Sequence, residues 1–213
     1  MRFRIDPTRE DRERHLRAAK LCHQVYEHAE DVHVVIAHPE DGRTYVAIEG
    51  SDTFANWCDN LDVRRIDGMH RGFARVARHC IDRYDLTDLL ERRERVVITG
   101  HSQGAAVALL ITHMLRARTS NVVELVLFGC PNVGDHAFLN SLQDDPATED
   151  TRVFLYRNGH DVVCVLPFGF LGFSNALRTR TIALESRIGG IFGSIRSHMI
   201  DQYVDALEAV DVL

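Results

Sequence analysis

The sequence has little of what marks a metal-binding, disulfide-rich or membrane-spanning protein. Its five cysteines include no Cys-x-x-Cys pair, so the spacing of a zinc site or a thioredoxin-like redox site is missing. No apolar run approaches the roughly 18 residues that span a bilayer, and the first residues contain no apolar segment typical of a signal peptide. We therefore expect a soluble protein in a reducing, intracellular compartment such as the cytoplasm, with no metal and no other cofactor.

An excess of positive charge is also lacking. Lys and Arg number 25 against 31 Asp and Glu, a net charge of -6, whereas a nucleic-acid binder needs a concentrated cationic face to neutralise phosphates. Nucleic acid is therefore excluded as an expected partner. The 213 residues, 45% of them hydrophobic, are enough for one well-packed core, so we expect a single domain over residues 1–213. The oligomeric state is left open.

Hydrophobic periodicity predicts alternating helices and strands. Helices are expected at residues 8–30, 73–84, 103–117, 136–142 and 199–209. Strands are expected at residues 32–37, 44–49, 95–99, 122–128, 152–156 and 179–184. The first two strands form a hairpin, and the later strands alternate with helices, which favours a mixed, mostly parallel sheet covered by helices on both faces. The fold class is therefore α/β.

One pentapeptide carries a chemical signal. Gly100-His101-Ser102-Gln103-Gly104 fits the pattern G-x-S-x-G, with a run of β-branched residues directly before it and an alanine-rich helical run directly after it. This is the strand–turn–helix context of a nucleophile elbow in an α/β-hydrolase fold, in which small neighbours leave room for a strained turn. The alternative is a serine that only caps the helix. We interpret Ser102 as the nucleophile.

A serine nucleophile needs a histidine base and a carboxylate that orients it, and in this fold they follow the serine in the order acid, then histidine. Asp161 lies just past the carboxyl end of a predicted strand, where catalytic groups of open α/β sheets collect. His198 follows a glycine-rich loop at the start of the last helix. His136 and His160 are weaker candidates, because one opens a helix and the other adjoins the acid. The predicted triad is Ser102, Asp161 and His198.

Six fragments in order resemble the class 3 lipases, the fungal-lipase-like branch of the α/β hydrolases. They are Tyr45 to Ser51, Asn56-Trp57-Cys58-Asp59-Asn60-Leu61, His70-Arg71-Gly72-Phe73, the elbow, Phe128 to Asp135, and Asn158 to Pro167. The resemblance implies the same triad. It also implies an oxyanion hole made by Ser51 and the backbone N–H of Gln103.

Three departures from the family pattern bear on the substrate. Glu49 stands where the family usually has an arginine before Gly-Ser, and Gln103 and Ala105 replace Leu and Gly after the serine. The stretch between Leu61 and His70 is short, so we expect a compact enzyme with a short lid region. This weakens the case for large triglyceride droplets as substrate.

The expected activity is hydrolysis of carboxylic esters, of lipids or of medium-chain acyl groups, through an acyl-enzyme. Phospholipase A1, monoacylglycerol lipase, small-ester esterase, thioesterase and peptidase chemistry stay open, as does a non-catalytic binding protein with this fold. The segment Leu166 to Phe173 is a candidate wall of the acyl pocket, an ordinary packing segment, or a transient contact with a lipid surface. The glycine-rich segment Ile188 to Ile195 is a candidate flap beside His198.

Overall fold

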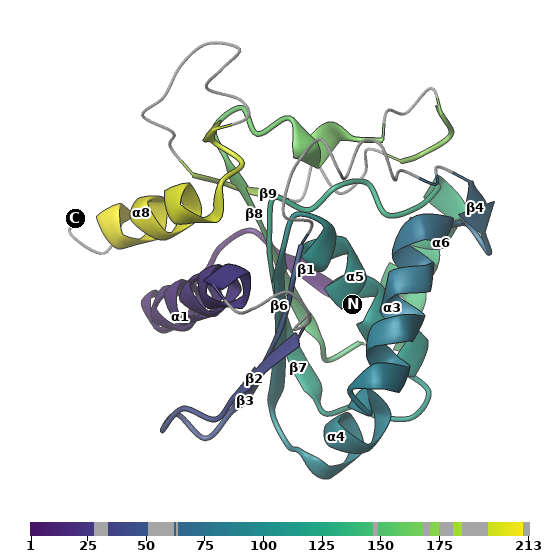
Figure 1. The fold of residues 1–213 in the computed structure, drawn as a ribbon, viewed down its shortest axis with the longest axis horizontal. Coiled ribbons are helices and arrows are strands. Elements are labelled where there is room, and N and C mark those ends of the chain that lie inside the picture. Colours follow the sequence, from purple (N-terminus) through teal and green to yellow (C-terminus); the bar gives the residue numbers. More distant parts are fainter. Residues whose placement is uncertain are drawn as a thin grey trace.

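The protein is an α/β sandwich with one central sheet. The computed structural model describes residues 1–27, 34–50, 62, 64–146, 149–167, 171–174, 181–184 and 196–210. Within these ranges, helices cover both faces of the sheet (Figure 1). No helix in this part of the chain is long and apolar enough to cross a membrane.

The sheet runs in the order β1-β8-β7-β6-β3-β2, with β9 also paired to β8. Its strands are β1 (Arg2–Arg4), β2 (Val34–Ala37), β3 (Thr44–Ile48), β6 (Val96–His101), β7 (Val122–Phe128), β8 (Arg152–Asn158) and β9 (Thr181–Leu184). Only the β2–β3 hairpin is antiparallel; every other pair is parallel. The expected mixed, mostly parallel sheet is therefore confirmed, and the carboxyl ends of its parallel strands meet at one edge.

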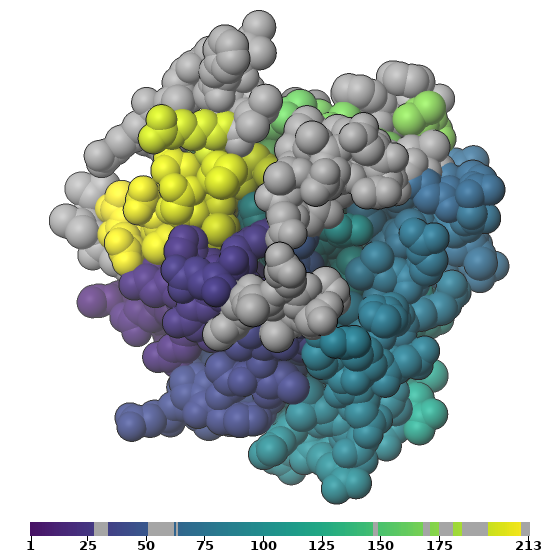
Figure 2. All heavy atoms as spheres, viewed as in Figure 1, coloured from purple at the N-terminus to yellow at the C-terminus, as the bar shows by residue number. Residues whose placement is uncertain are grey.

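Two groups of helices enclose the sheet. They are α1 (Arg9–Glu27) and α8 (Ile200–Val210) on one face, and α3 (Arg71–Arg83), α4 (Leu86–Arg92), α5 (Gln103–Leu115) and α6 (His136–Asp144) on the other. In Figure 2 the surfaces of α1 and α8 adjoin on one side of the molecule, and α3 forms much of the opposite side.

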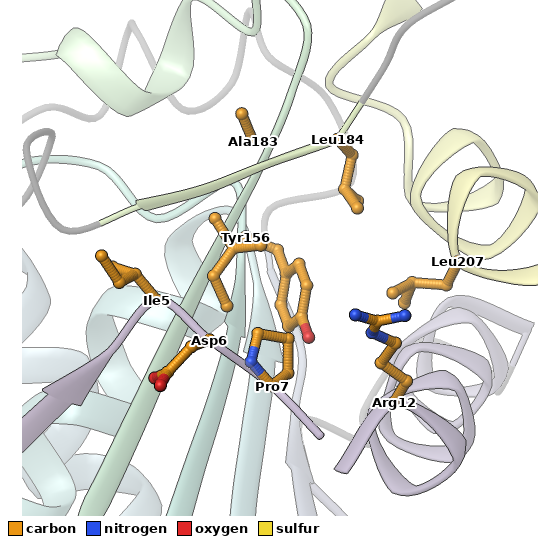
Figure 3. A pocket seen from close by; sticks show the side chains of 9 residues that line it. Ile5, Asp6, Pro7, Arg12, Tyr156, Ala183, Leu184 and Leu207 are labelled. Atoms are coloured by element: carbon orange, nitrogen blue, oxygen red, sulfur yellow. The ribbon is translucent and has the colours of Figure 1, made fainter. Parts of the chain in front are cut away.

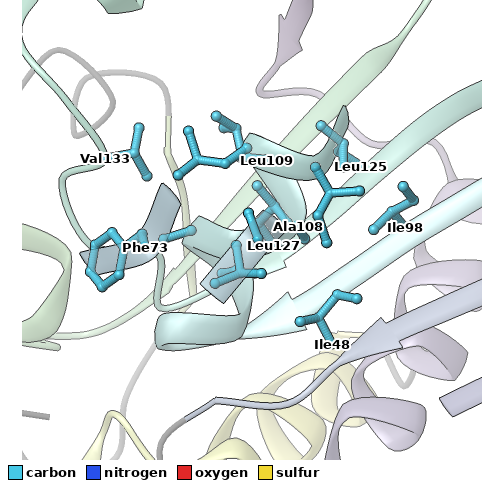
Figure 4. Packing of buried hydrophobic residues seen from close by; sticks show 14 of the residues in the cluster. Ile48, Phe73, Ile98, Ala108, Leu109, Leu125, Leu127 and Val133 are labelled. Atoms are coloured by element: carbon cyan, nitrogen blue, oxygen red, sulfur yellow. The ribbon is translucent and has the colours of Figure 1, made fainter. Parts of the chain in front are cut away.

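Each face of the sheet has its own hydrophobic core. Alternate residues of a strand point to opposite faces, so Val97 packs toward α1 and α8 while Ile98 packs toward α3 and α5. Figure 4 shows the core on the α3/α5 face, to which Ile98, Leu125 and Leu127 of the sheet and Leu109 of α5 belong. These two cores fix the strand ends that carry the candidate site.

Several short elements differ from the sequence-based expectation. Strand β1 has only three residues, too few for a periodic pattern, and it pairs with β8 at the edge of the sheet. A further helix, α4, lies between the expected helix at 73–84 and β6, with buried Leu86 and Leu90 at helical spacing. Strand β4 (Arg65–Ile66) pairs with β5 (Met69–His70) where no strand was expected. A 3-10 turn, Val163–Val165, follows the predicted acid.

Candidate active site

Ser102 lies in a strained turn between β6 and α5. Its backbone has φ 57° and ψ −127°, a conformation that costs energy for a residue with a side chain. A side chain at Gly100 would overlap the backbone of Gly104, and one at Gly104 would overlap the carbonyl of Ile48. The two glycines of the motif therefore allow β6, α5 and β3 to approach closely. The elbow predicted from the pentapeptide is present.

The three predicted triad side chains form one hydrogen-bonded chain. His198 Nε2 lies 2.8 Å from Ser102 Oγ, and His198 Nδ1 lies 2.8 Å from Asp161 Oδ2. Asp161 is fully buried, whereas His198 and Ser102 keep 8% and 6% of their surface exposed. A substrate carbonyl can therefore reach the serine while the carboxylate stays away from water.

Asp161 is held as a carboxylate by several donors. Burial opposes its ionisation, but His198, the Tyr203 hydroxyl and the backbone N–H of Val163 together lower the pKa of Asp161 below its ordinary value. The Tyr203 hydroxyl donates to Oδ2 over 2.5 Å, and the Val163 N–H donates to Oδ1 over 2.9 Å. An ionised Asp161 can orient the imidazole of His198 and stabilise its protonated form.

Gly129 makes room for the acid and the base. It follows β7 with φ 58°, and a Cβ at this position would lie 2.8 Å from Asp161 Oδ2 and 2.9 Å from the His198 ring. The positive φ and the close approach both favour glycine. Any larger residue would displace the hydrogen-bonded pair.

A second histidine, His101, supports the loop that carries the base. Burial and the neighbouring His198 lower the pKa of His101 to about 3, so its ring is neutral at physiological pH. Its Nε2 lies 2.5 Å from the carbonyl of His198, and its Nδ1 lies 2.9 Å from the Tyr26 hydroxyl. The simplest assignment has Nε2–H donating to the carbonyl and Nδ1 accepting from Tyr26 of α1.

Tyr26 also reaches the strand end that leads to Ser51. A Cβ at Gly50 would overlap the Tyr26 hydroxyl, so Tyr26 lies against both the elbow and the end of β3. Sequence reasoning did not identify Tyr26, His101 or Tyr203 as site residues. For Tyr203 a signal existed, because it lies just over one turn after His198 on the buried face of the last helix.

The other predicted features have mixed outcomes. Gln103 opens α5 directly after Ser102, which places its backbone N–H at the end of the helix with positive partial charge. Ser51, Trp57 and the rest of the lid-region fragment lie outside the described residues, as does the candidate flap at 188–195. The proposed second oxyanion donor and the length of the lid therefore stay predictions.

The segment Leu166 to Phe173 is described only at its two ends. The carbonyl of Leu166 accepts a hydrogen bond from the Asn132 N–H over 2.7 Å, and Phe173 is buried against the ring of His70. These ends pack into the protein, whereas Leu171 is 43% exposed. Residues 168–170, which include the two other phenylalanines, lie outside the described part.

Known proteins resemble this chain in sequence. The class 3 lipase family model matches residues 45–170. A secreted mono- and diacylglycerol lipase of Malassezia restricta is 30% identical over 110 residues, 51% of this chain and 34% of the relative. A lipase of Rhizomucor miehei is 28% identical over 162 residues, 68% of this chain and 44% of the relative. The chain thus spans between a third and a half of the length of these relatives.

Solved structures resemble this fold. The lipase from Rhizopus microsporus var. chinensis has a TM-score of 0.63 at 18% identity, covering 79% of this chain and 73% of that one. A triacylglycerol lipase described as having a serine-protease triad at its catalytic centre has a TM-score of 0.62 at 22% identity, covering 78% of each chain. These likenesses establish the α/β-hydrolase fold. Since the family model matches more than half of the sequence, the chain belongs to the class 3 lipase family.

Proposed function

We propose that this protein is a serine hydrolase that cleaves carboxylic esters of lipids or of medium-chain acyl groups. The hydrogen-bonded chain Ser102–His198–Asp161 is the observation that carries the proposal. Membership of the class 3 lipase family supports it. The strained backbone of Ser102 adds support, because nucleophiles are commonly held in such turns.

The reaction begins when Ser102 Oγ attacks the ester carbonyl and passes its proton to His198 Nε2. Asp161 stabilises the imidazolium, which then gives the proton to the departing alcohol, leaving an acyl group on Ser102. Water attacks this acyl-enzyme after His198 removes one of its protons. The carboxylic acid leaves as the proton returns to Ser102 Oγ.

Negative charge on the carbonyl oxygen needs donors that are already in place. The backbone N–H of Gln103 is one, because it lies at the start of α5 next to Ser102. We propose Ser51 as the second oxyanion donor, because the end of β3 resembles the corresponding segment of the family. No metal or cofactor takes part in this scheme.

Labelling with a fluorophosphonate probe tests the nucleophile. Wild-type protein is expected to label at Ser102, and Ser102→Ala to give no label. Equal labelling of both proteins would contradict the proposal. Folded protein that neither labels nor hydrolyses any ester would favour the non-catalytic binding protein instead.

The acyl preference is tested with p-nitrophenyl esters of increasing chain length. A preference for octanoate over acetate is expected if the substrate is a lipid or medium-chain ester, because a buried chain contributes about 0.8 kcal/mol per methylene. A clear preference for acetate would point to a small-ester esterase.

Phospholipid hydrolysis is a second candidate. A protein named phospholipase A1-IIdelta, from Arabidopsis thaliana, is 29% identical over 86 residues that cover 39% of this chain and 20% of the relative. Release of the fatty acid from the first glycerol position of phosphatidylcholine, compared with release from monoacylglycerol at equal concentration, distinguishes the two substrates. We place the monoacylglycerol first because the relative named as a mono- and diacylglycerol lipase matches 51% of this chain, against 39% for the phospholipase.

Contact with a lipid surface is proposed on the strength of two exposed apolar side chains. Met199, which directly follows His198, is 53% exposed, and Leu171 is 43% exposed. Exposed apolar groups near a substrate entrance favour adsorption to lipid. Binding to phosphatidylcholine vesicles should weaken in Met199→Gln and stay unchanged in a matched surface variant, Gln202→Asn. The intracellular location stays a prediction; fractionation of the native host cells would test it.

A further inference from the structure

A cavity separate from the triad lies on the α1/α8 face of the sheet. Its volume is about 350 Å³, within the range of small-molecule pockets. The chain that leaves β1 forms one side of it, β8 and β9 form its floor, and α1 and α8 close it (Figure 3). None of Ser102, Asp161 and His198 lines it.

The lining is mixed, with the charged residues Asp6 and Arg12 beside apolar side chains. Pro7, the ring of Tyr156, Ile182, Leu184 and Leu207 supply the apolar surface. The half-buried Arg12 turns its guanidinium toward Tyr156, Leu184 and Leu207 (Figure 3). Within the described residues, that guanidinium has no hydrogen bond or ion pair.

Nearby charges leave Arg12 without compensation. Asp6 also lines the cavity, but its carboxylate is exposed and turned away from Arg12 (Figure 3). On the same face of the sheet, the carboxylates of Asp11 and Glu124 are already paired with Arg14 and Arg152. A cation that is partly withdrawn from water next to apolar walls favours an anionic ligand.

We propose that this cavity binds a linear aliphatic carboxylate, with its head group on Arg12 and its chain against Leu184 and Leu207. A guanidinium is suited to carboxylates because it can donate two parallel hydrogen bonds. A straight alkyl chain suits the apolar side chains of Leu184 and Leu207 beside that guanidinium. The ligand class follows from the cavity alone and does not depend on hydrolysis by Ser102.

The walls of the cavity also contact the loop that holds Asp161. The carbonyl of Leu184 accepts a hydrogen bond from Gly159 N–H over 3.0 Å. Leu207 lies about one turn after Tyr203, whose hydroxyl donates to Asp161. A bound carboxylate would therefore stabilise β9 and α8 at a distance from the substrate.

Calorimetric titration of Ser102→Ala protein with decanoate, below its micelle concentration, tests the proposal. A site that depends on Arg12 is expected, separate from any binding in the acyl pocket, with affinity rising up to about fourfold per added methylene from hexanoate to decanoate. Arg12→Gln should weaken binding at least about tenfold, and Arg12→Lys should recover part of the loss. Arg9→Gln is the matched control, because Arg9 is on the same helix but 89% exposed, and its affinity should equal that of the parent.

The location is tested on wild-type protein whose Ser102 has been blocked with an alkyl fluorophosphonate. Unchanged decanoate affinity is expected, since the cavity is distinct from the acyl pocket. Loss of binding on blocking, equal affinity in Arg12→Gln, or no binding at all would overturn the proposal. Melting curves of each variant exclude unfolding as the cause. Failure of Ser102 to label would refute the proposed hydrolysis and leave the titrations on Ser102→Ala unaffected.

Discussion

The described part of the protein contains two buried hydrogen-bonded series of a carboxylate, a histidine and a hydroxyl, and only one of the two has the arrangement of a catalytic site. In the first, Asp161, His198 and Ser102 are joined in that order. In the second, His15 Nε2 lies 3.2 Å from Glu124 Oε1, and His15 Nδ1 lies 2.6 Å from the Tyr156 hydroxyl. A carboxylate, a histidine and a hydroxyl therefore meet twice: once between α1 and the sheet, and once at the carboxyl ends of the strands.

The two series differ in their surrounding charge. Arg14 and Arg152 bind Glu124 and also Asp11, so permanent cations neutralise the second cluster. Asp11, His15 and Glu124 present ligand atoms within 4.8 Å of one another, but the two guanidinium groups already supply the positive charge that a metal ion would bring. Asp161 instead has His198, the Tyr203 hydroxyl and the Val163 N–H as its partners among the described residues.

The two series also differ in access and backbone strain. Tyr156 comes from the middle of a regular strand and is 1% exposed, whereas Ser102 has a positive φ and lies at a strand end. Burial lowers the pKa of His15 and keeps this imidazole neutral, despite the hydrogen bond and the charge of Glu124. Ser102 is thus the more exposed and the more strained of the two hydroxyl residues, and the acid of its triad is balanced by a histidine and a tyrosine rather than by arginines.

The largest expected effect is on kcat, which should depend on Asp161 and not on Glu124. Asp161→Asn should lower kcat about 10⁴-fold, because the amide no longer stabilises the imidazolium or its tautomer. Hydrolysis of p-nitrophenyl octanoate measures this change, and thermal melting checks that the fold is kept. Near-normal turnover in this variant would move the acid to another residue.

The second expected effect is on the free energy of unfolding, which should depend on Glu124. Glu124→Gln leaves the two arginines with Asp11 as their only shared described anion, beside the exposed Glu10 on Arg14. The free energy of unfolding should therefore fall by about 3 kcal/mol. Urea denaturation measures it, and kcat of the folded protein should be unchanged. Asp88→Asn is the control: it removes a surface ion pair with Arg92 that contributes about 0.5 kcal/mol. Equal losses in the two variants would refute a structural role for the cluster.

A smaller effect is expected from the hydroxyl that supports Asp161. Tyr203→Phe removes a donor to this carboxylate and should lower kcat about tenfold with little change in KM. The pKa of Asp161 should rise, because its charged form loses a hydrogen-bond donor, and a pH profile of kcat/KM measures the change. Tyr45→Phe, which removes a 2.8 Å bond to Asp41 remote from the triad, should leave the profile unchanged.

The smallest effect concerns pH. Burial lowers the pKa of His70 and of His113 to about 4 and that of His101 to about 3. Between pH 6.5 and 4 the unfolded chain therefore binds more protons than the folded one, so stability is present above pH 6.5 and decreases as the pH falls. His113→Gln should reduce this slope by up to about 1.4 kcal/mol per pH unit. An unchanged slope from urea titrations at pH 7 and pH 5 would contradict the assignment.

Local patterns were sufficient to predict the elbow and the order of the triad. Gly100 and Gly104 flank the serine within one pentapeptide, and the positions of Asp161 and His198 follow from strand ends and loop composition. The supporting contacts of Tyr26 and His101 could not be predicted, because they join α1 to β6 over 75 residues of chain. Strand β1 was missed since its three residues are ordered by pairing with β8 rather than by their own pattern.

The second cluster left one trace in the sequence. Glu124 interrupts an otherwise apolar strand, and a buried carboxylate needs partners. The partners of Glu124 depend on where α1 crosses the sheet. Hydrophobic periodicity does not determine this position. The same limit explains why the cavity beside Arg12 could not be predicted from the residues alone.

The helix α1 reaches both buried series, with His15 in one and Tyr26 against the other. The two residues are eleven positions apart, which is about three helical turns, so they project from the same side of the helix. Adding or deleting one residue between them would rotate Tyr26 by about 100° relative to His15. The number of residues between His15 and Tyr26 is therefore constrained by contacts at both positions, since an insertion or a deletion would break one of them.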